Sequence, residues 1–148
     1  MKVACFLCIL LSLITSCASV QEYQRIVDDP EDGFYAGTEE GRRFMMIRDT
    51  TDLHFVADSA SLTMIDIESI YLQDHPHLSA DAHYLTLEFS DEGRTKIARL
   101  TESNLNKYIY FVLGGKIISA NLVMAKMDDQ FCTFISVKNF EKLFKEIE

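Results

Sequence analysis

The chain has 148 residues and a formal net charge of −9, and 48% of its residues are hydrophobic. That hydrophobic fraction is typical of a globular protein, and the length suits a single domain with a core of its own. Because an acidic surface repels phosphate groups, the charge argues against nucleic acid as a partner and against electrostatic binding to anionic lipids.

The chain begins with the pattern of a secretory signal. One lysine precedes an apolar run over residues 3–14, which is too short to span about 30 Å of hydrocarbon. Small residues and then Cys17 follow, and this arrangement resembles a bacterial lipobox. We therefore expect a signal peptide over residues 1–16, lipid on Cys17, and a membrane that the protein contacts through this lipid. The predicted location is the periplasm-facing bacterial envelope. The outer membrane is favoured by resemblance to known sorting rules, since no aspartate follows the cysteine.

An acidic, turn-rich segment comes next. Residues 17–41 are predicted to be a lipidated tether, because charged and turn-forming residues without periodicity gather there. Phe34 and Tyr35 are an exception and could form a short strand. The folded domain is expected over residues 42–148.

The first half of this domain shows short strand patterns. Residues 43–48 and 53–57 are predicted strands joined by a polar turn. Residues 64–71 follow as a helical turn or the start of a strand. Alternating apolar residues over 84–89 predict a half-buried strand.

The second half is more regular. A helix is predicted from Ser90, a candidate N-cap, to about Leu105, which we place on its inner face. The strand over 107–113 is apolar on both faces and is therefore expected at the centre of a sheet. Gly114 and Gly115 supply the positive φ angles of a tight hairpin.

Three further elements complete the predicted order. They are strands over 116–124 and 130–137 and an amphipathic helix over 140–147. The core order is therefore β-α-β-β-β-α, preceded by two or three short strands. It predicts an α+β fold with helices on one face of an antiparallel sheet. Within the last strand, Cys132 is expected to be a buried small hydrophobe.

The motifs of this region resemble the head of the first periplasmic domain of SecD. The residues that carry the resemblance are Leu85, Leu87, Phe89, Glu92, Gly93, Thr101, Asn104, the run 112–120 and, upstream, Ser61-Leu62-Thr63 with Asp66-Ile67. The chain departs from the family in having Gly114, Asn121 and Asn106 where aspartate, proline and glycine are usual. It also has no transmembrane helices after the signal, so the proton-driven motor of SecD is not implied.

For SecD the resemblance implies that the head binds an emerging polypeptide. Tyr108, Tyr110 and Met124 are our candidate polypeptide-binding residues, and the same side chains could instead belong to the core. An open hairpin edge would bind a peptide by strand addition. We expect a non-catalytic protein that binds polypeptide or a protein partner in export or envelope assembly. The alternative is a structural lipoprotein dedicated to one partner, such as an immunity or scaffold factor.

Reaction chemistry has little support in the sequence. There is no nucleophile elbow, phosphate loop or dinucleotide fingerprint. His54 lies in an apolar strand and is expected to be half-buried rather than a catalytic base. Two histidines in the loop Asp74-His75-Pro76-His77 are a weak metal signal. We therefore expect no enzyme activity, no metal and no cofactor.

Overall fold

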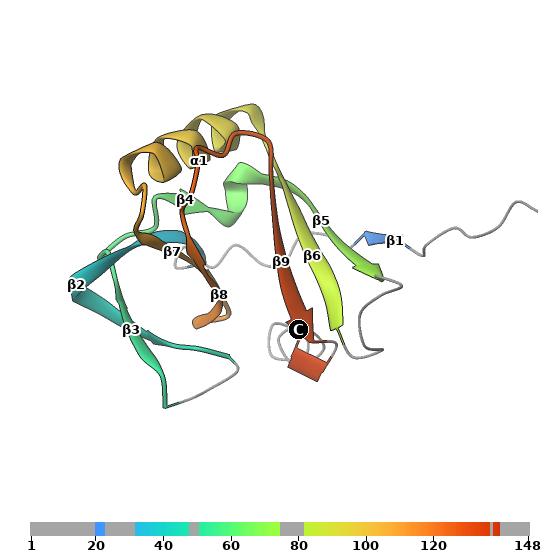
Figure 1. The fold of residues 1–148 in the computed structure, drawn as a ribbon. Helices are drawn as coiled ribbons and strands as arrows, with labels where there is room; N and C mark the ends of the chain where they lie inside the picture. The colour runs from blue at the N-terminus through green and yellow to red at the C-terminus, as the bar shows by residue number, and fades with distance from the viewer. Residues whose placement is uncertain (1–19, 23–31, 48–50, 75–81, 137, 140–148) are drawn as a thin grey trace, which may run out of the picture.

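The computed structural model describes residues 20–22, 32–47, 51–74, 82–136 and 138–139. Its strands form two antiparallel sheets, and one helix lies across the top of both in the view of Figure 1. The predicted α+β class is thus confirmed at the level of antiparallel sheet with a helix. The expectation of one sheet is wrong, because the described strands divide into two.

The first sheet has four strands in the order β1-β5-β6-β9. Their bounds are Val20–Glu22 (β1), Ile67–Asp74 (β5), Ala82–Phe89 (β6) and Gln130–Ser136 (β9). The second sheet has five strands, in the order β3-β2-β7-β8 with β4 also paired to β2. Their bounds are Gly33–Met45 (β2), Leu53–Val56 (β3), Leu62–Thr63 (β4), Tyr108–Leu113 (β7) and Lys116–Leu122 (β8). A short 3-10 helix, η1, spans Met64–Asp66, and the helix α1 spans Asp91–Ser103.

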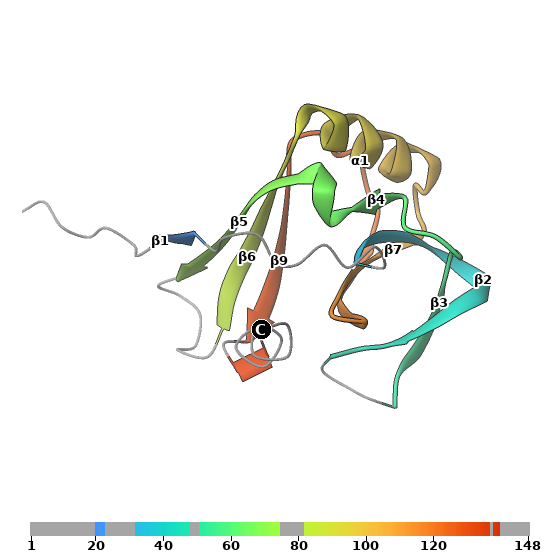
Figure 2. The same ribbon diagram turned by 180° about the vertical axis from the view of Figure 1, so that it is seen from behind.

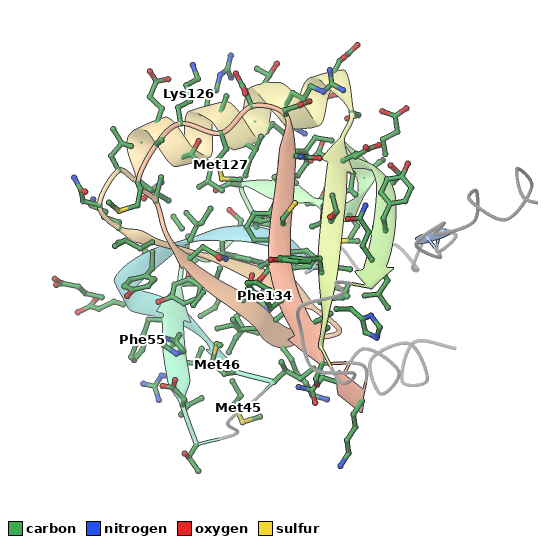
Figure 3. The ribbon with its side chains drawn as sticks, turned by 45° about the vertical axis from the view of Figure 1, so that its right-hand side comes forward. Met45, Met46, Phe55, Lys126, Met127 and Phe134 are labelled. Carbon is green, nitrogen blue, oxygen red and sulfur yellow. The ribbon has the colours of Figure 1, made fainter. Side chains whose placement is uncertain are left out.

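The division into two sheets arises after β8. Residues 123–129 form a connection rather than a tight turn, and β9 then pairs with β6 along its whole length. Met127 of this connection lies under α1 (Figure 3), and its backbone N–H donates to Thr101 Oγ1 at 2.9 Å. Lys126 lies beside the helix, with Nζ 3.6 Å from Glu102 Oε2. The connection is therefore held against α1, and the chain passes from one sheet to the other.

The main core lies between the two sheets and under α1. Phe34 is completely buried there, and its ring stacks on Phe111 at 4.8 Å between centroids. It also meets Phe131 edge-on at 4.9 Å and Phe89 at 5.8 Å. One β2 side chain thus joins both sheets. Residues 33–41 are strand, so the predicted tether over 17–41 ends too late and the domain begins before residue 42.

A second core cluster lies on the other face of β2, β7 and β8. Its buried members are Tyr35, Phe44, Val56, Tyr110, Val112 and Ile117. Phe44 and Val56 come from the β2–β3 hairpin, which projects at one side of the molecule in both ribbon views (Figures 1 and 2). Gly41, at φ +146°, lies in the register shift between Gly37 and Arg42, and a Cβ there would lie 2.1 Å from the Val56 carbonyl oxygen. The predicted pairing of the strands over residues 43–48 and 53–57 is confirmed for Arg43 to Met45, which pair with Phe55 to Leu53.

Several local predictions hold and two fail. Ser90 caps α1, because its Oγ accepts from the Gly93 N–H at 3.1 Å. The helix stops at Ser103, and Asn106 takes a positive φ of 61°. The chain turns away there, so Leu105 is exposed and not on the inner face. Cys132 is also exposed, because alternation along β9 turns Phe131 inward and Cys132 outward. The signal over 1–16, Cys17 and the closing helix over 140–147 lie outside the described residues.

Candidate functional site

Asp66 and Gly93, two of the residues that carry the resemblance to SecD, contact each other at the start of α1. Asp66 is 3% exposed, and its carboxylate accepts from the Thr63 backbone N–H at 3.0 Å and from Lys96 Nζ at 2.7 Å. Its carbonyl oxygen accepts from the Ser90 N–H at 3.0 Å. Gly93 lies directly above, and a Cβ there would be 2.1 Å from that same carbonyl oxygen. These residues therefore join η1 to α1, which is a structural role.

The other helical motif residues are also engaged in packing. Thr101 Oγ1 donates to the Ile97 carbonyl at 2.8 Å and accepts from the Met127 N–H. Asn104 Nδ2 donates to the Leu100 carbonyl at 2.8 Å and so caps the end of the helix. These hydrogen bonds hold the end of α1 and attach the connection after β8 to the helix.

Asp32 has a structural role that the sequence did not indicate. It is 1% exposed, and its carboxylate accepts from the N–H of Gly114 at 2.9 Å and of Gly115 at 3.4 Å. The two glycines have φ angles of +58° and +67°, so the predicted positive-φ hairpin is confirmed. Asp32 was assigned to the acidic tether because its partners are 82 and 83 positions away in the chain.

Exposed apolar side chains gather where α1 leads into β7 and where β8 ends. Tyr108 pairs with Leu122 across the two strands. The Asn106 N–H donates to the Val123 carbonyl at 2.8 Å, so the flanking segments also lie side by side. We call the exposed set the apolar patch: Leu105 (47% exposed), Tyr108 (50%), Leu122 (46%) and Met124 (75%). Two of the three candidate binding residues, Tyr108 and Met124, belong to it.

Tyr110, the third candidate, is mostly part of the second core cluster. It is 7% exposed, and its Oη lies 3.3 Å from His54 Nδ1. His54 Nε2 lies 3.0 Å from the Asp52 carboxylate, and the half-buried position predicted for this histidine is confirmed. Burial first, and then the nearby charges of Tyr108 and Asp52, raise the pKa of the Tyr110 phenol. The ring is thus held in one place by a chain of polar contacts.

A cleft of about 590 Å³ opens beside the apolar patch. Its lining residues are Gly37, Thr38, Glu39, Lys107, Tyr108 and Tyr110. The two tyrosine rings lie 6.3 Å apart and nearly parallel, at 29°. Gly37 lets β2 lie close to β7, because a Cβ there would be 2.9 Å from both the Tyr108 carbonyl oxygen and the Tyr110 ring. Tyr108 therefore belongs both to the patch and to the cleft.

The outer edge of β8 adjoins the same patch. At its start, the Ile47 N–H donates to the Ile117 carbonyl at 2.9 Å. Within the described ranges, no strand pairs with the outer edge over residues 118–122, since β8 is last in the order of its sheet. Backbone groups along this edge are the kind that an added strand would bind.

Other surfaces of the described residues have fewer features of a binding site. Phe134 projects from β9 (Figure 3), 44% exposed, and its ring lies 4.4 Å from that of Tyr84. Met45 and Met46 lie near one end of the β2–β3 hairpin in the same view. Among the residues that the structure describes, no three His, Cys, Asp or Glu side chains gather as metal ligands. His75 and His77 lie outside those residues.

Comparison with protein-family models and with curated proteins finds nothing that matches this chain. Over the described part of the chain, no helix is both long enough and apolar enough to cross a bilayer.

Proposed function

We propose that this protein is a lipoprotein of the bacterial envelope that binds polypeptide or a protein partner without catalysis, in protein export or envelope assembly. In this proposal, Cys17 carries the lipid anchor, and the folded domain, which includes β2, is a SecD-head-like domain of core order β-α-β-β-β-α. The observation that carries the proposal is the apolar patch beside the outer edge of β8.

The chemistry of this surface suits an extended chain. Apolar side chains that cluster on a surface favour contact with other apolar groups, because water is released when they are covered. Backbone groups at a strand edge add hydrogen bonds that do not depend on the sequence of the bound segment. Together the two features support broad recognition of polypeptides rather than recognition of one small molecule.

Crosslinking in living cells tests the proposed surface. A photoreactive amino acid replaces Leu122 or Met124 in the patch, and in the control it replaces Thr95, an exposed residue of α1. We expect many secreted polypeptides to be captured from the patch positions and few from position 95. Capture of one dominant protein would favour the alternative, a lipoprotein dedicated to a single partner. Equal capture from all three positions would contradict a role for the patch.

The anchor is tested separately. Replacing Cys17 by alanine should abolish incorporation of labelled palmitate and release the protein from the membrane fraction, because no other residue is proposed to carry lipid. Cys132→Ala is the matched control, since Cys132 is an exposed thiol in the described part of the chain. Its protein should keep the label. A Cys17→Ala protein that stays labelled and membrane-bound would refute the lipobox interpretation.

A further inference from the structure

The cleft beside the apolar patch has walls of unequal charge and an aromatic floor. Glu39 lines it from β2, while Lys107 lines it from the residue before β7. Among the described residues, neither side chain forms an ion pair. Glu40 is exposed next to Glu39, and the charge of Asp52 acts on Tyr110 from beyond His54. The lining itself therefore holds one carboxylate, Glu39, and one ammonium, Lys107, in a chain whose net charge is −9.

The aromatic faces in the cleft favour a positively charged ligand. A cation over a tyrosine ring is attracted by the negative face of the ring. Tyr108 is half-exposed and nearly parallel to Tyr110, whose ring is held by His54. The same molecule places guanidinium groups over rings elsewhere: Arg42 lies 5.0 Å from the Phe44 centroid and Arg43 lies 5.0 Å from that of Phe55.

We propose that this cleft accepts an arginine side chain of the polypeptide bound at the apolar patch, with the guanidinium over the face of Tyr108 and near the Glu39 carboxylate. This inference rests on the proposed function, because Tyr108 joins the cleft to the patch. A planar guanidinium stacks on an aromatic ring and pairs with a carboxylate at the same time, which an ammonium does less well. The Lys107 ammonium lines the same cleft, so it repels the bound guanidinium and weakens its binding.

The first test uses two extended fluorescent peptides that differ only in a central arginine or citrulline, a neutral side chain of nearly the same shape. With the full chain, the arginine peptide should bind about threefold more tightly, as expected for one exposed cation–π contact. Glu39→Gln should reduce this ratio toward one, and Lys107→Gln should increase it. The control Glu68→Gln, at an exposed position of β5 in the other sheet, should leave it unchanged. Equal binding of the two peptides by the unmodified chain would overturn the inference and leave the proposed function standing.

A second measurement examines the cleft without any polypeptide. N-acetylarginine amide is titrated into the ¹⁵N-labelled full chain, with N-acetylcitrulline amide in parallel. Amide shifts at residues 37–39 and 107–110 that appear only with the arginine compound support the cleft preference. If these shifts occur while neither peptide binds, polypeptide binding at the patch is refuted and the arginine preference remains. If they are absent, the arginine preference is overturned.

Discussion

Two regions of the molecule are built in opposite ways. One is the junction between η1 and α1, and the other is the open end of the β7–β8 hairpin, opposite its turn, where Tyr108 pairs with Leu122. At the junction, Asp66 is buried and engaged by backbone and ammonium donors, and Gly93 leaves no space above it. At the hairpin end, Tyr108 and Met124 are exposed and the cleft beside them is open. The difference separates residues that hold the fold from residues that are available to a partner.

The comparison also limits what the SecD resemblance can support. Gly93 and Thr101, from its specific part, and Asp66, from the weaker upstream part, are engaged in packing and internal hydrogen bonds. Packing of this kind is a requirement of a fold and is compatible with many functions. The proposed function therefore depends on the apolar patch, where the resemblance is weaker.

The largest change in stability should come from adding a side chain at Gly93, where α1 lies directly against η1. Gly93→Val places a branched side chain against the Asp66 carbonyl, where even a Cβ would lie at 2.1 Å. We expect a loss of about 3 kcal/mol or more in the free energy of unfolding, because backbone must move to relieve the overlap. Chemical denaturation measures it, with Arg99→Ala, on the exposed face of the same helix, as the control. A loss below about 1 kcal/mol would contradict close packing of α1 on η1.

Local sequence patterns predicted much of this fold. Alternation over 84–89, the N-cap at Ser90 and the double glycine at 114–115 are signals that act within a few residues. Each of them is confirmed because a strand, a helix start or a tight turn is determined largely by its own residues.

The failures involve distant partners or a shift by one residue. The burial of Asp32 depends on N–H groups more than 80 positions later in the chain. The division into two sheets, with β9 paired to β6, likewise depends on how residues 123–129 pack on α1. Cys132 was assigned to the wrong face because one step along a strand reverses the direction of a side chain.

At the site, Tyr108 and Met124 were identified from sequence, but the cleft with Gly37 and Glu39 was not. Those two residues lie in the segment taken for a tether.

In the apolar patch, at the open end of the β7–β8 hairpin, polar substitutions should weaken polypeptide binding and leave stability almost unchanged. The double change Leu122→Ser and Met124→Ser should weaken binding of an unfolded polypeptide about tenfold, because each exposed apolar side chain contributes roughly 0.5–1 kcal/mol when it is covered. Stability should change by less than about 0.5 kcal/mol, as expected at exposed positions. Ile65→Ser is the control, since Ile65 is 63% exposed and lies in η1, outside the patch. Fluorescence anisotropy measures binding, and equal weakening by the control would show that the patch has no special role.

The smallest expected effect is a change in stability at Tyr110, which belongs to the second core cluster and also lines the cleft. Tyr110→Phe removes the contact with His54 Nδ1 at 3.3 Å and should lower stability at pH 7 by about 0.5–1 kcal/mol. The pKa of this phenol is raised in the folded protein, mainly by burial. Above pH 10 the unfolded chain therefore loses the Tyr110 proton first, and the unmodified protein becomes less stable as the pH rises. The phenylalanine variant lacks this term, so the stability difference between the two proteins should shrink from pH 8.5 to pH 10.5. A difference that stays constant over that interval would mean that Tyr110 ionises equally well in both states and belongs to the open surface rather than to the core.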